Sequence, residues 1–217
     1  MIKLDKNKIL IDIKKAVLTG EDALAQNLAR KAIKEGAEPI KVLNEAQNAM
    51  IEAGELWKRN DYFQGDVVLS AEAFHVVMEV VEPLLSSGEI GKSGKVIIGT
   101  VAGDMHNLGK IMVIATLRGA GFEVVDLGED VSIQTFISKI KQLKPNILGL
   151  GCYMTTTMME MKEIIKELQK EGLRNNLKIM IGGVPITQEY ANEIGADAWG
   201  KDAFDAADKA KGLVGVK

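Results

Sequence analysis

Two side chains that could hold a metal stand close together in one short segment. The segment reads Gly103-Asp104-Met105-His106-Asn107-Leu108-Gly109 and follows the apolar run Val96-Ile97-Ile98. An imidazole ligates a metal through one ring nitrogen while a carboxylate accepts the proton on the other nitrogen, which fixes the tautomer and raises the basicity of the ligand. The spacing of Asp104 and His106 therefore predicts a histidine ligand that is oriented by a carboxylate.

The chain has few other side chains with which to complete a metal site. It contains two histidines, His75 and His106, and one cysteine, Cys152. A zinc site needs three or four protein ligands, so this chain has too few histidines and cysteines for a zinc site. A metal that arrives inside a macrocycle needs only one axial ligand, and His106 could provide it.

Two other ligand classes are disfavoured by the same loops. A dinucleotide-binding domain would carry a Gly-x-Gly-x-x-Gly loop after the first strand, whereas Asp104 would repel a phosphate there. A phosphoacceptor domain would need an aspartate at the end of the third strand, where this chain has Gly151-Cys152-Tyr153.

The second half of the chain alternates between strand and helix patterns. Strands are predicted at 95–100, 122–127, 147–150, 178–181 and 196–199, and helices at 111–119, 132–143, 156–171, 187–194 and 203–214. This rhythm is typical of a parallel sheet with helices on both faces. In such sheets ligands bind at the carboxyl ends of the strands, which is where the Asp104 loop lies.

The first half has helical periodicity throughout. Helices are predicted from Ile9 to Gly20, at 22–35, at 39–57 and at 64–85, and short connections between them favour a four-helix bundle. The stretch 86–94 has the composition of a linker. We therefore predict a helical bundle cap at 1–88 and a doubly wound, five-stranded, Rossmann-like α/β domain at 89–217.

Composition restricts the class of function. The 217 residues carry a formal net charge of -3 and no Lys/Arg cluster, so no nucleic-acid partner is expected. No apolar stretch is long enough to span a membrane, and the N-terminus does not have the pattern of a signal peptide. A single cysteine suits a reducing compartment, so we expect a cytoplasmic protein.

Several motifs together resemble a known family. Asp104-Met105-His106-Asn107-Leu108-Gly109 has the form Asp-x-His-x-x-Gly, Gly182-Gly183 follows the fourth strand, and Met154-Thr155-Thr156-Thr157-Met158 follows the third. These resemble corrinoid (cobalamin-binding) proteins of methylotrophic methyltransferase systems and the cobalamin-binding region of methionine synthase. In the first half, Glu55-Leu56-Trp57, Asp61-Tyr62-Phe63 and Ala71-Glu72-Ala73 look like the helical cap of that group.

The resemblance implies a site and a function. It implies cobalamin as cofactor, with His106 as the cobalt ligand and with cofactor contacts from Asp104, Met105, His106, Asn107, Leu108, Gly109, Gly151, Tyr153, Thr155, Thr156, Gly182 and Gly183. It also implies a methyl carrier that is not catalytic alone. Such a carrier accepts a methyl group on cobalt(I) from a substrate-specific methyltransferase and delivers it to a second methyltransferase, with a pterin or thiol as acceptor, and it needs a reductive activase. The alternatives are a subunit of a B12-dependent radical mutase and a B12-dependent gene regulator, the latter lacking room here for a DNA-binding domain.

One position departs from the family pattern. The family usually has Ser-x-Leu at the end of the third strand, where the serine hydroxyl meets the cofactor's base, and this chain has Gly151-Cys152-Tyr153. Thr155, Thr156 or a water would have to replace that hydroxyl. We interpret Cys152 as a packed small residue. In the first half of the chain, we interpret His75 and Phe63 as parts of the bundle core.

Overall fold

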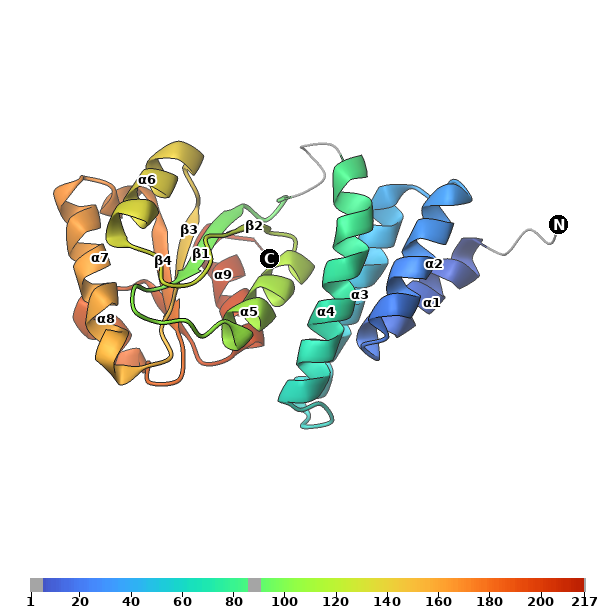
Figure 1. Ribbon diagram of the computed structural model, residues 1–217, viewed down its shortest axis with the longest axis horizontal. Helices are drawn as coiled ribbons and strands as arrows, with labels where there is room; N and C mark the ends of the chain where they lie inside the picture. The colour runs from blue at the N-terminus through green and yellow to red at the C-terminus, as the bar shows by residue number, and fades with distance from the viewer. Residues whose placement is uncertain (1–5, 86–90, 217) are drawn as a thin grey trace. The chain divides into compact units, whose positions relative to one another are not determined.

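The computed structural model describes residues 6–85 and 91–216. The chain divides into two compact units, one of residues 1–92 with 118–121 and one of residues 93–117 with 122–217 (Figure 1). The division predicted at residue 88 falls among residues that lie outside the described part of the chain, as does most of the predicted linker, so both stay predictions.

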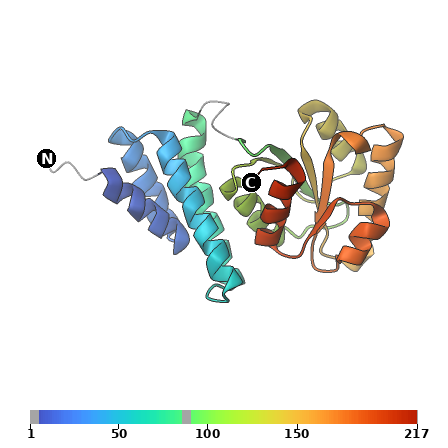
Figure 2. The same cartoon turned by 180° about the vertical axis from the view of Figure 1, so that it is seen from behind.

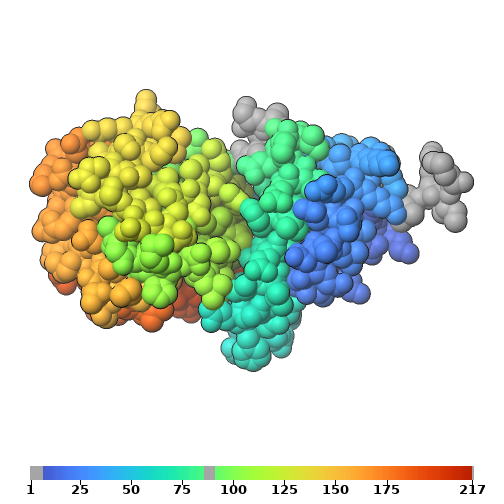
Figure 3. Space-filling model, in the orientation of Figure 1, coloured from blue at the N-terminus to red at the C-terminus, as the bar shows by residue number. Residues whose placement is uncertain are grey.

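The first unit consists of helices, as predicted. Its elements are α1 (Lys6–Leu18), α2 (Asp22–Lys34), α3 (Pro39–Lys58) and α4 (Gln64–Val81), followed by the short 3-10 helix η1 (Glu82–Leu84). Pro39 begins α3, where its missing N–H costs no helical hydrogen bond. In the space-filling view the helices of this unit, coloured blue to green, are packed closely along their lengths (Figure 3).

The core of the helical unit is made largely of small and aliphatic side chains. Ala25, Ala29 and Ala32 of α2 are fully buried, and α2 packs extensively on α4. Two predictions for this unit were wrong. His75 is exposed on α4, with its Nε2 3.5 Å from a Glu79 carboxylate oxygen, and Phe63 is exposed at the start of the same helix.

The second unit is the predicted five-stranded α/β domain. Its strands run parallel in the order β2-β1-β3-β4-β5. The strands are β1 (Lys95–Thr100), β2 (Glu123–Asp126), β3 (Ile147–Gly151), β4 (Lys178–Gly182) and β5 (Ala198–Gly200). The helical elements are α5 (Leu108–Gly119), α6 (Ile133–Leu143), η2 (Thr155–Thr157), α7 (Met158–Lys170), η3 (Arg174–Asn176), α8 (Gln188–Ile194) and α9 (Ala203–Val214).

Helices cover both faces of this sheet. Helices α6, α7 and α8 pack with the strands around one large hydrophobic core, and α5 and α9 lie on the opposite face (Figures 1 and 2). The Thr116 hydroxyl of α5 donates to the Ala203 carbonyl at the start of α9, at 2.9 Å, and so joins the two helices of that face. Within the described ranges, no helix is both long enough and apolar enough to cross a membrane.

The strand order places the loops that follow β1 and β3 beside each other. The chain leaves β1 in one direction across the sheet to β2 and later returns to β3 on the other side, so β1 and β3 flank the switch point of the sheet. In open α/β sheets the crevice at this point binds ligands. The Asp104 loop follows β1, and Tyr153 follows β3, so both belong to this crevice.

Candidate functional site

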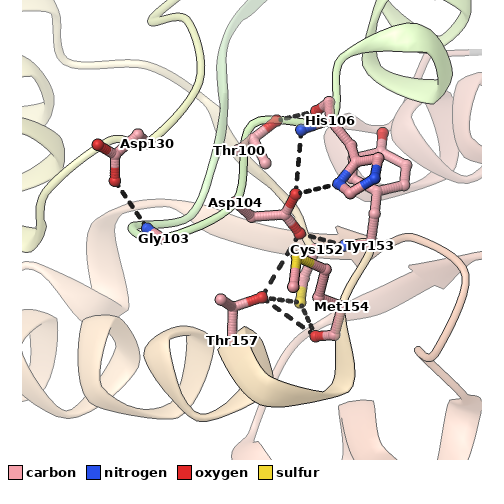
Figure 4. Close-up of polar contacts among 9 residues, drawn as sticks. All are labelled: Thr100, Gly103, Asp104, His106, Asp130, Cys152, Tyr153, Met154 and Thr157. Atoms are coloured by element: carbon pink, nitrogen blue, oxygen red, sulfur yellow. Dashed lines mark hydrogen bonds and ion pairs between the residues drawn. The ribbon is translucent and has the colours of Figure 1, made fainter.

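The Asp104 carboxylate is fully buried and organises the loop after β1 (Figure 4). Its Oδ1 accepts a hydrogen bond from the backbone N–H of His106 at 3.0 Å and lies 2.7 Å from Nδ1 of the same residue. A carboxylate acceptor at this distance places the ring proton on Nδ1. The loop is therefore folded by the same carboxylate that fixes the imidazole tautomer.

The second oxygen of Asp104 binds the loop after β3. Oδ2 accepts from the backbone N–H of Tyr153 at 2.6 Å and from the Thr157 hydroxyl at 3.4 Å. Burial acts to raise the pKa of Asp104, but the N–H groups of Tyr153 and His106 outweigh burial and hold this pKa below its usual value. Asp104 is thus an anion that ties two loops together across the switch point.

The His106 ring is open to ligands on its other side. Its side chain is 61% exposed although its partner Asp104 is buried. Because Nδ1 is held by Asp104, Nε2 carries the lone pair with which this ring would ligate a metal. The backbone of the ligand is fixed as well, since the buried Thr100 hydroxyl donates to the His106 carbonyl at 3.0 Å.

These residues fit a metal that is already held by a flat macrocycle. In residues 6–85 and 91–216 no three His, Cys, Asp or Glu side chains are grouped closely enough to hold an ion by themselves. Exposed apolar side chains are also present in the loops at this edge of the sheet, namely Met105, Leu108, Met154 and Val184. One exposed imidazole among exposed apolar side chains suits a single axial bond and a large apolar ring.

A row without side chains runs across the sheet just below this edge. Gly151, Gly182 and Gly200 end β3, β4 and β5 and are paired in register, with Thr100 of β1 beside Gly151. The missing side chains of this row lie on the face of the sheet that α5 and α9 cover, so an extended ligand tail would meet no side chain of these three residues there. At Gly200 the close approach of α9 to the sheet requires a glycine, since a Cβ on Gly200 would lie 2.8 Å from the Cβ of Ala206 in α9.

Gly183 has a separate reason to be glycine. Its φ is +128°, a conformation that other residues rarely adopt, and a Cβ there would overlap the carbonyl oxygen of Cys152. This glycine brings the loop after β4 against the loop after β3.

A buried lysine anchors the helix that follows the site. The Lys110 side chain in the first turn of α5 is only 1% exposed, and its ammonium contacts the carboxylates of Asp126 and, at 3.1 Å, Glu129. Both carboxylates lie at or just after the end of β2. No role was predicted for Lys110 from the sequence, although it directly follows Gly109 of the Asp-x-His-x-x-Gly motif.

The structure brings some of the predicted site residues together and leaves others apart. Asp104 is hydrogen-bonded to His106 and to the backbone of Tyr153, and the Tyr153 ring lies beside His106, Gly109 and Gly151. Besides His106, the predicted residues with exposed side chains are Met105, Asn107, Leu108, Thr155 and Thr156. Their roles, and those of Gly182 and Gly183, stay predictions.

Two hydroxyls of the site were missed. Thr157, and not Thr155 or Thr156, contacts Asp104, and Thr100 is the buried hydroxyl next to Gly151. The run Thr155–Thr157 gave no reason to choose its third member. A polar residue at the end of the apolar strand 95–100 was the available signal for Thr100.

Comparison with protein families gives two matches along this chain. A family model described as a B12 binding domain matches residues 94–208, and a second model with the same description matches residues 9–82. The two matches together cover both units.

Similar proteins are found among curated sequences and among solved structures. The trimethylamine corrinoid protein 1 of Methanosarcina acetivorans is 38% identical over 96% of this chain and 98% of its own length. A corrinoid protein of Desulfitobacterium hafniense is 35% identical over 95% and 98%. The crystal structure of the methanol:cobalamin methyltransferase complex from Methanosarcina barkeri matches with a TM-score of 0.83 and 27% identity, covering 98% of this chain and 82% of that chain.

Proposed function

The chain belongs to the B12-binding corrinoid protein family, and we propose that it carries methyl groups between methyltransferases on a bound cobalamin. The observation that carries this proposal is the exposed His106 ring whose Nδ1 is held by the buried Asp104 carboxylate at 2.7 Å. Such a pair supplies one oriented axial ligand and no second protein ligand.

Bound cobalamin would supply a cobalt that accepts and releases the methyl group. The protein's part is to hold and orient this cofactor. His106 would hold the cobalt through Nε2, because Asp104 keeps the ring proton on Nδ1 and leaves the lone pair on Nε2. Thr100 and Tyr153 hold the loop that carries this pair: the Thr100 hydroxyl donates to the His106 carbonyl, and the Tyr153 backbone N–H donates to an oxygen of Asp104.

A carrier of this kind needs partners. A methyltransferase partner is supported by the match to the methanol:cobalamin methyltransferase complex. We further propose a second methyltransferase, with a pterin or thiol as acceptor, and a reductive activase. The names of the relatives include trimethylamine and dimethylamine, so the methyl donor that we propose is a small methylated amine.

The radical mutase alternative receives no comparable support. A mutase subunit would lack the preceding helical unit, whereas the relatives match 95% or more of this chain and therefore include that unit. Binding of adenosylcobalamin without any methyl acceptance would favour the mutase.

Retention of a labelled methyl group tests the proposal. The protein is reconstituted with hydroxocobalamin, reduced, and incubated with radiolabelled trimethylamine and a trimethylamine methyltransferase, then separated by gel filtration. We expect label to elute with the wild-type protein and with His75→Ala, whose histidine is exposed on α4, and much less label with His106→Ala. Absence of label on the wild type with trimethylamine, dimethylamine, monomethylamine and methanol systems alike would reject the carrier function.

A further inference from the structure

The Tyr153 ring lies at the entrance to the row of glycines. Its centroid is 6.0 Å from that of the His106 ring, with the planes tilted by 39°. A Cβ added to Gly151 would lie 3.4 Å from Cε2 of Tyr153, and a Cβ added to Gly109 would lie 2.7 Å from Cε1 and 2.8 Å from the phenol oxygen. The ring is thus bounded by the end of β3, the start of α5 and the imidazole (Figure 4).

This position is on the side of the sheet that the glycines of the row face. The Cβ direction of Gly151 points toward the ring, and Gly109 belongs to α5, which covers that face of the sheet. The Tyr153 ring therefore occupies space beside both the His106 imidazole and Gly151, the first glycine of the row.

The backbone and the side chain of Tyr153 have separate roles. The backbone N–H donates to Asp104 at 2.6 Å, and any residue except proline could make this bond. The side chain makes the contacts at Gly109 and Gly151. Substitution of the side chain therefore tests the ring while the hydrogen bond to Asp104 is kept.

We propose that Tyr153 limits the size of the lower base that this protein accepts on its corrinoid. This inference rests on the proposed function. The ring and a bulky base require overlapping space beside Gly151, and close-packed atoms cannot share volume, so binding of a bulky tail requires that the ring be displaced. A corrinoid without the tail can reach His106 without displacing it.

Two corrinoids that differ in the tail test whether the Tyr153 ring obstructs the tail alone or corrinoid binding in general. Hydroxocobalamin carries the dimethylbenzimidazole tail, and cobinamide lacks it. Both are titrated by visible absorbance into the full chain as wild type, Tyr153→Leu, Tyr153→Met, Tyr153→Phe and Tyr190→Phe. Tyr190→Phe is the matched control for loss of a phenol, because Tyr190 lies on α8 and bonds to the Met158 carbonyl.

We expect Tyr153→Leu and Tyr153→Met to bind hydroxocobalamin about tenfold more tightly than wild type, a change within the range of relieved overpacking. Their affinity for cobinamide should change by less than about twofold, because that ligand does not displace the ring. Tyr153→Phe keeps the ring and should behave as wild type, as should Tyr190→Phe. The two smaller side chains provide independent tests if one of them impairs folding, which far-UV circular dichroism reports.

Two results would overturn the proposal. Weaker or unchanged binding of hydroxocobalamin by both Tyr153→Leu and Tyr153→Met, with cobinamide binding retained, would show that the ring does not obstruct the tail. This result would leave the carrier function intact. Binding of neither corrinoid to the wild type would reject the proposed function, and this inference with it.

Discussion

Asp104 is the residue on which the geometry of the site depends. Its two oxygens accept hydrogen bonds from the His106 N–H, the His106 ring, the Tyr153 N–H and the Thr157 hydroxyl, and the Asp104 side chain itself has no exposure to solvent. A buried anion is stable only when its hydrogen bonds are satisfied, and here they come from two loops. The ligand and its supporting loop are therefore one structural unit.

Replacement of Asp104 by asparagine should destabilise the cofactor-free protein. The amide would point a donor at groups that are themselves donors, so the change should cost about 2–3 kcal/mol of unfolding free energy in urea at pH 7. Asp130→Asn is the control, because Asp130 accepts a single N–H bond, from Gly103, at an exposed position. An Asp104→Asn variant as stable as this control would show that Asp104 does not hold the loops together.

The same carboxylate gives a pH dependence of known sign. Because the pKa of Asp104 is lowered by folding, its charge stabilises the native state above the ordinary range of aspartate and ceases to do so as pH falls through the lowered value. The stability difference between wild type and Asp104→Asn should therefore shrink below about pH 4. A difference that persists undiminished in acid would contradict the assignment of a buried carboxylate anion.

At the scale of elements, the site depends on the approach of the loops after β3 and β4. Gly183 makes this approach possible, because its φ is positive and because any Cβ at this position would overlap the Cys152 carbonyl oxygen. Gly172 serves as a control: its φ is also positive, at +68°, but a Cβ at this position would face open space. Gly172 thus reports the cost of a left-handed αL backbone alone, whereas at Gly183 a φ outside the αL region and the overlap with Cys152 both add to that cost.

Gly183→Ala should therefore cost more stability than Gly172→Ala. We expect about 1 kcal/mol for Gly172→Ala from the backbone alone and more than about 3 kcal/mol for Gly183→Ala, in which a backbone clash is added. Urea unfolding of both variants measures the difference. Equal losses would mean that the two loops do not require close contact.

Much of the element order could be predicted from the sequence, because the spacing of apolar residues and the Gly and Pro residues that end each element are local features. The strand at Lys95–Thr100 and the helix at Ala203–Val214 have their predicted bounds. The fourth helix was predicted to run to residue 85 but ends at Val81, because Pro83 lacks the N–H that the helix needs and a 3-10 turn replaces it.

The site was predictable only in part. Asp104 and His106 are two residues apart, so their pairing is a local property of one loop. The contacts of Thr157 with Asp104 and of the Tyr153 ring with Gly109 join loops more than 40 residues apart in the chain and depend on strand order. No spacing within either loop indicates them.

At the scale of the whole molecule, the groups that form the site belong to one of the two units. Thr100, Asp104, His106, Tyr153 and the row of glycines all lie in the α/β unit. Such a unit has its own sheet and its own hydrophobic core, which are the requirements for independent folding.

The α/β unit should bind the cofactor without the helical unit. We expect residues 91–217, expressed alone, to bind hydroxocobalamin within about threefold of the affinity of the full chain, a difference below 1 kcal/mol. Equilibrium titration by absorbance compares the two proteins. A folded fragment that binds no corrinoid would show that the helical unit supplies part of the site.

The visible spectrum of the protein reconstituted with hydroxocobalamin tests the central claim most directly. The wild type, His106→Ala and the control His75→Ala are compared. We expect the wild type and His75→Ala to share one spectrum of bound cofactor with an imidazole ligand, and His106→Ala to lose that spectrum or the colour itself, because Nε2 of His106 is the ligand held by Asp104. An identical bound spectrum in wild type and His106→Ala would show that His106 is not the ligand and would contradict the account of the site.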